Sequence, residues 1–170
     1  MEVSSPEGIE SAVEQFMKIG GQTTDCFNAR QVALYTGLQL EEMAEKLMAI
    51  AEGCISPGYS RKLIDFAREM NALADKFKAG YHVGDIVRAN YEEILDADID
   101  LAWVALGGAF SISTNATGAV GEVARANLDK YPNGEVLRDE NGKVQKPEGW
   151  RGPDLSPYVT PNPSFLILVK

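Results

Sequence analysis

The chain has 170 residues, of which 45% are apolar and 24% charged, and its formal net charge is −9 at pH 7. This length and composition are typical of one globular domain that buries a real core. The negative charge argues against a protein that coats nucleic acid, and no apolar run is long enough to span a bilayer.

Apolar residues at helical spacing predict three helices in the first half of the chain, over residues 6–19, 29–52 and 59–78. In the first helix, Ser5 can act as the cap and Pro6 suits the first turn. The second helix is expected to end at Gly53, with Pro57 beyond it. The third helix is amphipathic, with charges of both signs, and is typical of a helix that packs on one face.

A fourth helix is expected to start near residues 83–85, to break or bend, and to continue to residue 113. After Asp100 it is apolar on all sides, which is typical of a central buried helix. Gly107 and Gly108 disfavour helix, so close backbone packing is the expected reason for their presence.

A fifth helix is expected from a cap at Asn115 or Thr117 to about residue 130. Beyond it, two short stretches flank an Asn-Gly turn signal at residues 141–142, which predicts a small β-hairpin. Five prolines from residue 147 onward predict an extended tail, and residues 165–169 are typical of a short strand.

The predicted fold class is therefore all-α: an antiparallel helical bundle with a small C-terminal β-hairpin and an extended tail. We expect residues 1–130 to form the bundle and residues 131–170 to belong to the same domain. The two cysteines, Cys26 and Cys54, have no metal-ligand spacing, and the N-terminus lacks the features of a signal peptide, so a cytoplasmic location is expected.

Two groups of carboxylates lie on otherwise apolar helices. Glu41, Glu42 and Glu45 project in one general direction from the second helix, and Asp96 and Asp100 share a face of the fourth. Like charges at these spacings repel, and a hard cation would offset the repulsion. A solubilising first turn that favours the helix dipole is the alternative explanation of the aspartates.

Antiparallel packing of the two acidic helices would bring these carboxylates opposite one another. With His82 as the only histidine, His-rich zinc and di-iron sites are almost excluded, and an all-oxygen pocket suits Mg²⁺ or Mn²⁺. Magnesium usually binds carboxylates together with substrate phosphates, which indicates phosphoryl or nucleotidyl chemistry. We expect His82 itself to be a surface residue, with a catalytic role as the alternative.

Residues 41–45 followed by residues 96–107 resemble the paired acidic motifs of the all-α nucleoside triphosphate pyrophosphohydrolases. This superfamily includes MazG-like proteins, dimeric dUTPases and phosphoribosyl-ATP pyrophosphohydrolase. The likeness continues through residues 122–130 and 142–155, and it is strongest to phosphoribosyl-ATP pyrophosphohydrolase-like proteins of bacteriophages and bacteria. E-E-x-x-E alone is a weak signal, but the acidic pairs in this order, followed by K-P-x-G-W-x-x-P-D, are quite specific together.

The resemblance implies a Mg²⁺-dependent homodimer or homotetramer, with Mn²⁺ as a possible substitute. In such enzymes water attacks the α-phosphate of a nucleoside triphosphate, giving the monophosphate and pyrophosphate. By position, Glu41 or Glu42 would orient or deprotonate the water. The metals would be held by Glu41, Glu42, Glu45, Asp96 and Asp100.

Five further residues match positions that the resemblance assigns to nucleotide binding. Asn127 and Lys130 form an N-x-x-K pair placed to touch sugar or phosphates, and Lys146, Trp150 and Asp154 belong to a tail that closes over the nucleotide. The alternatives are that Trp150 is a packed aromatic anchoring the tail and that both lysines are ordinary surface residues.

Two features depart from the superfamily pattern. The segment at about residues 60–80 separates the acidic motifs, which predicts either an added bundle helix or a rearranged site. An E-x-x-D motif ending at Asp100 would have a glutamate at position 97, but this position is alanine. We therefore expect Asp96 to act as the ligand in its place, with Glu93 as the alternative.

The expected function is thus a cytoplasmic pyrophosphohydrolase of dNTPs or non-standard NTPs, working in the host cytoplasm if a phage encodes it. A non-catalytic helical oligomer that binds a nucleotide or a protein partner is the alternative of a different class. Phosphoribosyl-ATP pyrophosphohydrolase is the alternative within the superfamily.

Overall fold

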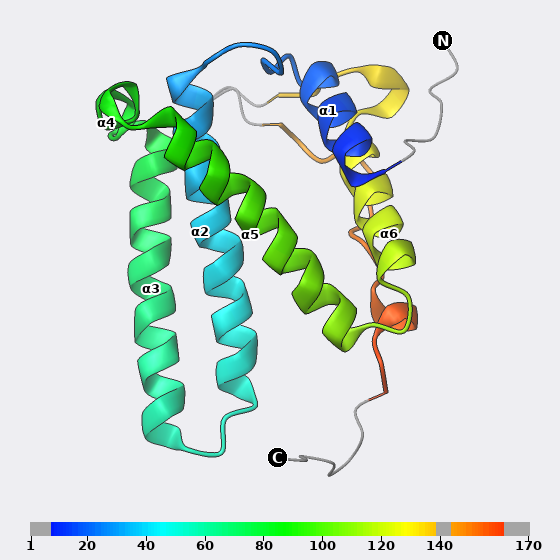
Figure 1. Ribbon diagram of the computed structural model, residues 1–170. Coiled ribbons are helices and arrows are strands. Elements are labelled where there is room, and N and C mark those ends of the chain that lie inside the picture. Colours follow the sequence, from blue (N-terminus) through cyan, green and yellow to red (C-terminus); the bar gives the residue numbers. More distant parts are fainter. Residues whose placement is uncertain (1–7, 139–143, 162–170) are drawn as a thin grey trace. The chain divides into compact units, whose positions relative to one another are not determined.

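A computed structural model describes residues 8–138 and 144–161 of the chain. In these residues the structure is mostly helical, with six α-helices and two short 3-10 helices, and pairing of extended backbone is limited to isolated bridges (Figure 1). The predicted all-α class is confirmed. The chain divides into two compact units: unit 2 is Asp25–Tyr91, and unit 1 joins Met1–Thr24 to Glu92–Lys170. The predicted domain boundaries stay a prediction.

Unit 2 is built on two long helices, α2 (Ala29–Glu52) and α3 (Pro57–Ala79), followed by the short helix α4 (Val83–Arg88). The Asn28 side chain caps α2 by accepting a hydrogen bond from the Gln31 amide at 3.1 Å. The predicted bounds of α2 are confirmed, but α3 begins two residues earlier than predicted. Pro57 starts the helix because the first turn needs no amide donor from it.

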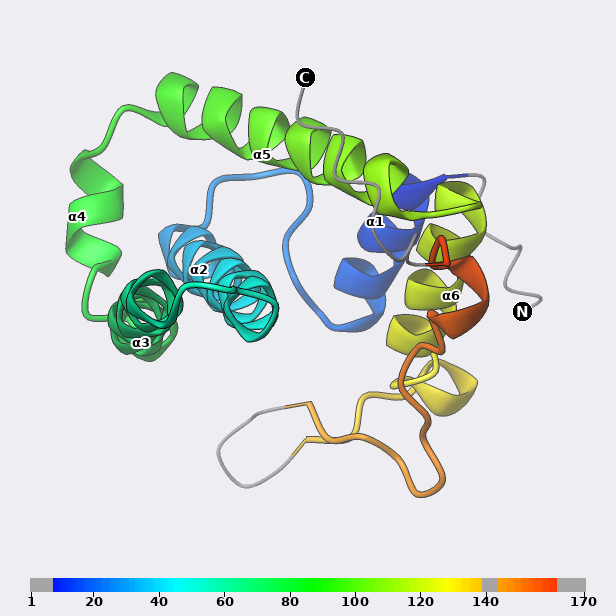
Figure 2. The ribbon, with the colours of Figure 1, turned by 90° about the horizontal axis from the view of Figure 1, so that it is seen from below.

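Helices α2 and α3 lie side by side along their length, joined by the short link at residues 53–56 (Figures 1 and 2). The buried residues of both helices are all small: Ala33, Gly37, Ala44 and Ala51 on α2, and Ala67 and Ala74 on α3. Several of them recur at intervals of seven, the period of a coiled-coil seam.

The backbones of α2 and α3 approach closely at this seam. A Cβ atom added at Gly37 would lie 2.8 Å from the Ala74 carbonyl oxygen. None of the large apolar residues of α2 is buried, and Met43 is 39% exposed. The long apolar residues dominate the sequence pattern of α2, but alanine and glycine make its closest contact with α3.

Unit 1 contains α1 (Ile9–Ile19), all of α5 (Tyr91–Ile112) except its first residue, and α6 (Ala116–Leu128). It also contains the 3-10 helices η1 (Pro132–Gly134) and η2 (Ser156–Tyr158). Helix α1 packs on α6, and the Phe16 and Tyr131 ring centroids are 4.8 Å apart. Of the two predicted caps of α6, Asn115 is confirmed, because its side chain accepts a hydrogen bond from the Gly118 amide at 2.9 Å. The predicted roles of Ser5 and Pro6 lie outside the described residues.

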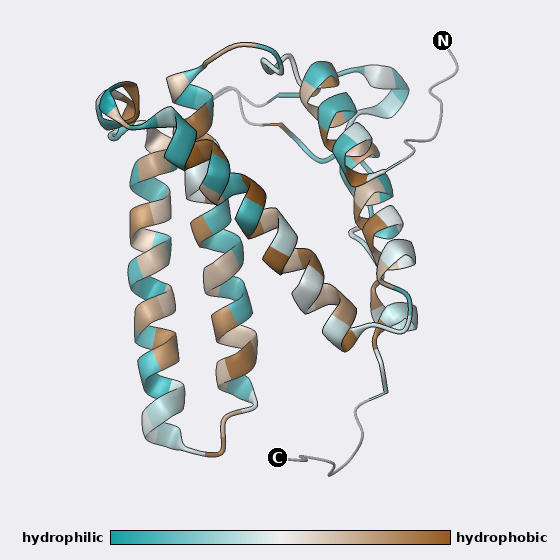
Figure 3. Ribbon diagram, viewed as in Figure 1, coloured by the Kyte–Doolittle hydropathy of each residue, from teal (hydrophilic) through white to brown (hydrophobic). Residues whose placement is uncertain are grey.

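Helix α5 confirms one prediction and leaves another untested. The expected break in the fourth helix is confirmed, because α4 ends at Arg88 and α5 begins at Tyr91. Within unit 1, α6 packs with α1 and η2, and no residue of α5 is buried. Apolar residues recur along α5 (Figure 3), and the expected burial of this helix stays a prediction.

The region after α6 is irregular. Arg138 and Val144 form an isolated antiparallel bridge, and the Gln145 amide donates a hydrogen bond to the Leu137 carbonyl at 2.7 Å. The predicted turn at residues 139–142 and the predicted strand at 165–169 lie outside the described residues, so the hairpin stays a prediction. None of the helices that the structure describes combines the length and apolar character needed to cross a membrane.

Candidate functional site

The three predicted glutamate ligands lie on the middle of α2. Glu41 is half-buried, whereas Glu42 and Glu45 are exposed. The Glu41 carboxylate forms an ion pair with Lys78 of α3, with Oε1 and Nζ 3.0 Å apart. Lys78 also lies 3.1 Å from the Asp75 carboxylate. The sequence analysis expected a metal ion to balance the charge of the α2 glutamates. For Glu41, Lys78 balances that charge instead.

The environment of Lys78 favours its charged form. Partial desolvation by itself lowers the pKa of Lys78, but hydrogen bonds from its ammonium to Glu41 and Asp75 outweigh this and raise the pKa above its ordinary value. The segment that separates the acidic motifs in the sequence is thus α3, and it supplies both the packing surface for α2 and the cation beside Glu41.

The predicted aspartate ligands lie on the first half of α5, where Asp96, Asp100 and the reserve ligand Glu93 are all exposed. They belong to unit 1, and the glutamates of α2 belong to unit 2. The pairing of the two acidic helices therefore stays a prediction. Among residues 8–138 and 144–161, no group of three or more Asp, Glu, His or Cys side chains is close enough to hold a metal ion. Carboxylate oxygens nevertheless have the donor chemistry that Mg²⁺ prefers.

The single histidine packs more closely than expected for a surface residue. The His82 side chain is 30% exposed, its Nδ1 atom lies 3.0 Å from Asp85 Oδ2, and its ring centroid is 4.4 Å from that of Phe77. The hydrogen bond with His82 is the main reason that the pKa of Asp85 is lowered. These contacts fix the start of α4 and do not involve the predicted ligands.

Four of the five predicted nucleotide-binding residues come together at the C-terminal end of α6. Lys146 Nζ lies 4.4 Å from the Trp150 ring centroid, and Lys130 Nζ lies 5.6 Å from it. Lys130 also donates a hydrogen bond to Asn127 Oδ1 at 2.7 Å. We call Asn127, Lys130, Lys146 and Trp150 the cation–aromatic cluster. It combines two ammonium groups with one indole ring.

Local structure explains how the cluster forms. Asn127 lies in the last turn of α6 and Lys130 follows two residues after its end, where the hydrogen bond between them holds both side chains together. On the tail, a turn in which the Trp150 amide donates to the Pro147 carbonyl at 3.0 Å places the indole beside them, and Gly149 provides the positive φ of 77°. Phe16 of α1, which the sequence did not single out, lies 5.9 Å from Lys130 Nζ.

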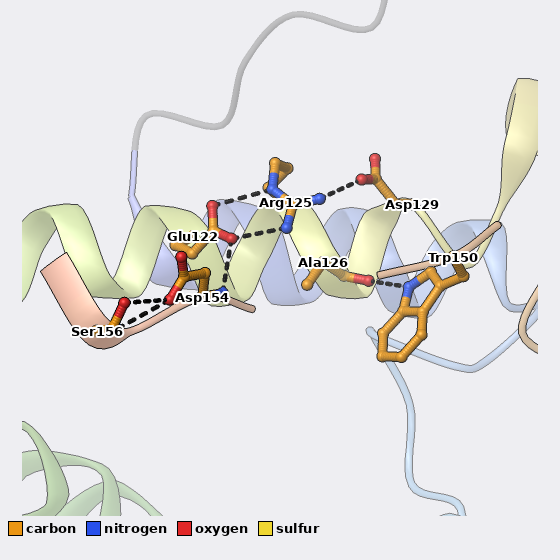
Figure 4. A network of polar contacts seen from close by, with 7 residues as sticks. All are labelled: Glu122, Arg125, Ala126, Asp129, Trp150, Asp154 and Ser156. Carbon is orange, nitrogen blue, oxygen red and sulfur yellow. Dashed lines mark hydrogen bonds and ion pairs between the residues drawn. The ribbon is translucent and has the colours of Figure 1, made fainter. Parts of the chain in front are cut away.

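The tail that carries Trp150 follows α6 in the opposite direction, and we call residues 147–160 the strap. The Trp150 Nε1–H group donates to the Ala126 carbonyl at 2.7 Å, and the Asp154 amide donates to Glu122 Oε1 at 3.0 Å (Figure 4). The step from Trp150 to Asp154 along the strap thus matches one turn backward along α6, from Ala126 to Glu122. Trp150 both anchors the strap and contributes to the cluster.

Asp154, the fifth predicted nucleotide-binding residue, lies apart from the cluster. Its carboxylate accepts hydrogen bonds from the Ser156 amide at 3.1 Å and the Ser156 hydroxyl at 2.7 Å (Figure 4). This is the pattern of an Asx turn, and it shapes the strap at the start of η2. A contact between Asp154 and a nucleotide stays a prediction.

Hydrogen bonds along α6 keep the carboxylate of Glu122 ionised. Arg125 donates to both carboxylate oxygens of Glu122, at 2.7 and 3.0 Å, and also to Asp129 (Figure 4). These hydrogen bonds from Arg125, together with the one from the Asp154 amide, lower the pKa of Glu122 from 4.5 to about 2. Glu122 therefore links the ion pair on α6 to the backbone of the strap.

The strap should loosen in acid. The pKa of Glu122 in the folded protein, about 2, lies below its ordinary value of 4.5. Its contribution to stability is therefore fully present above about pH 4.5 and is lost as the pH falls through about 2. Protection of the Asp154 amide from hydrogen exchange, compared between pH 5 and pH 1.5, measures this. In Glu122→Gln the amide should already exchange rapidly at pH 5, and equal protection in both proteins would contradict the assignment.

Trp150→Phe should weaken the strap and leave α6 intact. Phenylalanine keeps an aromatic ring beside the lysines but cannot donate to the Ala126 carbonyl, which removes a hydrogen bond with a net value of about 1 kcal/mol. Limited proteolysis should therefore cut the strap several-fold faster. Trp103→Phe, which changes an exposed indole on α5, is the matched control and should leave the cleavage rate unchanged.

Comparison of the chain with protein-family models, with curated proteins and with solved structures finds no match. The functional argument therefore depends on the residues themselves: carboxylates on α2 and α5, and a cluster of two ammonium groups and an indole at the end of α6. Carboxylates suit a divalent cation, and ammonium groups beside an aromatic ring suit an anion that carries a planar base.

Proposed function

We propose that this protein is a metal-dependent nucleoside triphosphate pyrophosphohydrolase, which converts a (d)NTP and water into the (d)NMP and pyrophosphate. The proposal combines the resemblance of the acidic motifs with the cation–aromatic cluster. Its finer parts are an antiparallel bundle with a C-terminal hairpin, a homodimer or homotetramer, and a cytoplasmic location.

The cation–aromatic cluster is the observation that carries the proposal. Asn127 lies on α6, Lys130 lies two residues beyond its end, and Lys146 and Trp150 lie about twenty residues later in the chain. All four match positions that the resemblance assigns to nucleotide binding. A site for a triphosphate needs cations for the phosphates, and an indole ring offers a surface on which a base can stack.

Different residues of the chain would bind the metal ion, accept the proton and bind the phosphates. Mg²⁺, held by Glu41, Glu42, Glu45, Asp96 and Asp100, would acidify a bound water and stabilise charge on the phosphates. Because Glu41 already forms an ion pair with Lys78, we assign to Glu42 the role of general base, which accepts the proton of the attacking water. Lys130 and Lys146 bind the phosphates, and pyrophosphate leaves from the α-phosphorus.

A non-catalytic helical protein is the second candidate, and the Glu41–Lys78 ion pair is the observation that favours it. If lysines balance the acidic residues of α2, no metal ion is needed there. Such a protein would bind a nucleotide at the cation–aromatic cluster without hydrolysing it. We place the enzyme first because Glu42 and Glu45 are exposed on the same helix as Glu41, and carboxylate oxygens are the ligands that Mg²⁺ prefers.

Pyrophosphate release from a panel of dNTPs, NTPs and non-standard triphosphates tests the proposal. We expect turnover of at least one triphosphate with Mg²⁺ and none with EDTA. Folded protein that binds a triphosphate but hydrolyses none of the panel would support the non-catalytic candidate. Turnover of phosphoribosyl-ATP alone would instead indicate the other enzyme of the superfamily.

Lys146→Ala should weaken binding of a triphosphate about tenfold or more, because one charge-assisted contact to a phosphate contributes about 1.5–3 kcal/mol. Calorimetric titration of a non-hydrolysable triphosphate measures the change. Lys62→Ala, which removes an exposed lysine of α3, is the matched control for net charge. Equal weakening in both variants would mean that only the overall charge matters.

A further inference from the structure

Lys130 of the cation–aromatic cluster lies near a second aromatic ring, which comes from a different helix. Its ammonium group is 5.9 Å from the Phe16 ring centroid and 5.6 Å from the Trp150 ring centroid. It also donates a hydrogen bond to Asn127 Oδ1 at 2.7 Å. Phe16 lies on α1, Asn127 in the last turn of α6 and Trp150 on the strap. Three segments of unit 1 therefore meet at one ammonium group.

Packing within unit 1 fixes the position of Phe16. Ala12 lies one turn earlier on the same face of α1 and is buried, and α1 packs on α6 (Figures 1 and 2). The Phe16 ring lies against that of the buried Tyr131, with centroids 4.8 Å apart and ring planes inclined by 35°. Arg138 holds the end of α1 by donating a hydrogen bond to the Gly20 carbonyl at 2.6 Å. Phe16 is thus held in place by contacts outside the cluster.

An aromatic face holds a lysine in a way that suits a site for an anion. The face carries the negative part of the ring quadrupole, so it attracts an ammonium group, but it adds no formal negative charge. The carboxylates of Glu41 and Asp75, which hold Lys78 in unit 2, would in contrast repel a phosphate. The two rings near Lys130 therefore restrict its ammonium group without opposing the approach of an anion.

The position of Lys130 matters because its side chain is long and flexible. A phosphate that binds a lysine must restrict the rotamers of that side chain, and this restriction lowers the affinity. Contacts with two rings and an amide oxygen make the restriction before the ligand arrives. A cation–π contact needs the face of a ring, so a leucine of similar apolar size cannot replace Phe16 in this role.

We propose that Phe16 is a positioning residue of the triphosphate site, whose ring, together with that of Trp150, holds the Lys130 ammonium group where the phosphates bind. This adds α1 to a site that the family resemblance assigns to α6 and the tail. The inference rests on the proposed function in one respect, which is the assignment of the cluster to a triphosphate. Phe16 then acts on the phosphates through Lys130 and does not touch the base.

Calorimetric titration with inorganic triphosphate, without Mg²⁺, tests the inference, because this ligand has phosphates but no base or sugar. Phe16→Leu should weaken its binding about 2–5-fold, the loss expected for one cation–π contact near the surface. Phe16→Tyr keeps the ring face and should bind as the wild type does. Ala12→Gly is the matched control: it loosens α1 but keeps both rings, so it should lower the melting temperature without changing the affinity.

A double-mutant cycle shows whether Phe16 acts through Lys130. Lys130→Ala should weaken the binding of inorganic triphosphate about tenfold or more, as expected for one charge-assisted contact. In the Lys130→Ala chain, Phe16→Leu should cause no further loss of affinity. Independent losses in the two variants would overturn the inference. So would a Phe16→Leu protein that binds inorganic triphosphate normally and a nucleoside triphosphate weakly, because the ring would then stack on the base.

NMR of the ligand-free protein separates this inference from the proposed enzymatic activity. Ring currents should shift the Lys130 Cε methylene protons upfield. Phe16→Leu should move them toward the position of an ordinary lysine, and Phe16→Tyr should not. If these shifts and the cycle hold but no triphosphate is hydrolysed, the inference stands and the enzymatic assignment fails. If pyrophosphate is released but Phe16→Leu leaves the methylene protons unmoved, the enzyme stands and the inference fails. Wild-type protein that does not bind inorganic triphosphate would also overturn the inference.

Discussion

Glu42→Gln and Glu45→Gln should each lower pyrophosphate release by at least about 10²-fold, while the helix content of the protein stays the same. In Glu42→Gln the attacking water loses its base, an effect typically worth 10²–10⁴-fold. In Glu45→Gln the divalent cation loses an anionic ligand. Both side chains are exposed on α2, and both substitutions leave its buried alanines and Gly37 unchanged.

Stability separates this outcome from the non-catalytic alternative. Removing one of several like charges from a helix relieves repulsion of a few tenths of a kcal/mol, so an inert α2 should hold or gain stability. In the enzyme, added Mg²⁺ should raise the melting temperature of the wild type but raise that of the variants less. Glu52→Gln, an exposed glutamate at the end of the same helix, is the control and should keep full activity.

The largest effect on stability is expected from Ala44→Leu. Ala44 is completely buried between α2 and α3, where the helices are close enough that a Cβ atom at Gly37 would collide with the Ala74 backbone. Leucine cannot fit at this seam unless the helices separate, and overpacking of this kind costs about 1–3 kcal/mol. Urea unfolding followed by far-UV circular dichroism should show a clear shift of the helical transition to lower urea.

Ala49→Leu provides the matched control, because Ala49 lies on the exposed side of the same helix. The two substitutions change volume and helix propensity equally and differ only in burial, so Ala49→Leu should stay within about 0.5 kcal/mol of the wild type. Equal destabilisation by both would mean that the close contact between α2 and α3 is not the source of stability.

The sequence by itself determined the features that arise within a few residues of one another. The bounds of α2, the break between α4 and α5 and the cap at Asn115 follow from the spacing of apolar residues and from side chains that bond their own helix ends. The family resemblance also points to the four residues of the cation–aromatic cluster. Such features depend on local geometry, which a pattern of neighbouring residues contains.

Only the tertiary structure decided which elements meet. It paired α2 with α3 through alanine and glycine, although the sequence pattern pointed to leucine and methionine, and it placed Lys78 beside Glu41, 37 residues earlier. It also brought Trp150 to Ala126. The pattern of an apolar or acidic helix face indicates that another group packs on it or binds to it. Which group does so depends on shape and on contacts between distant residues, and the periodicity of the sequence does not contain this information.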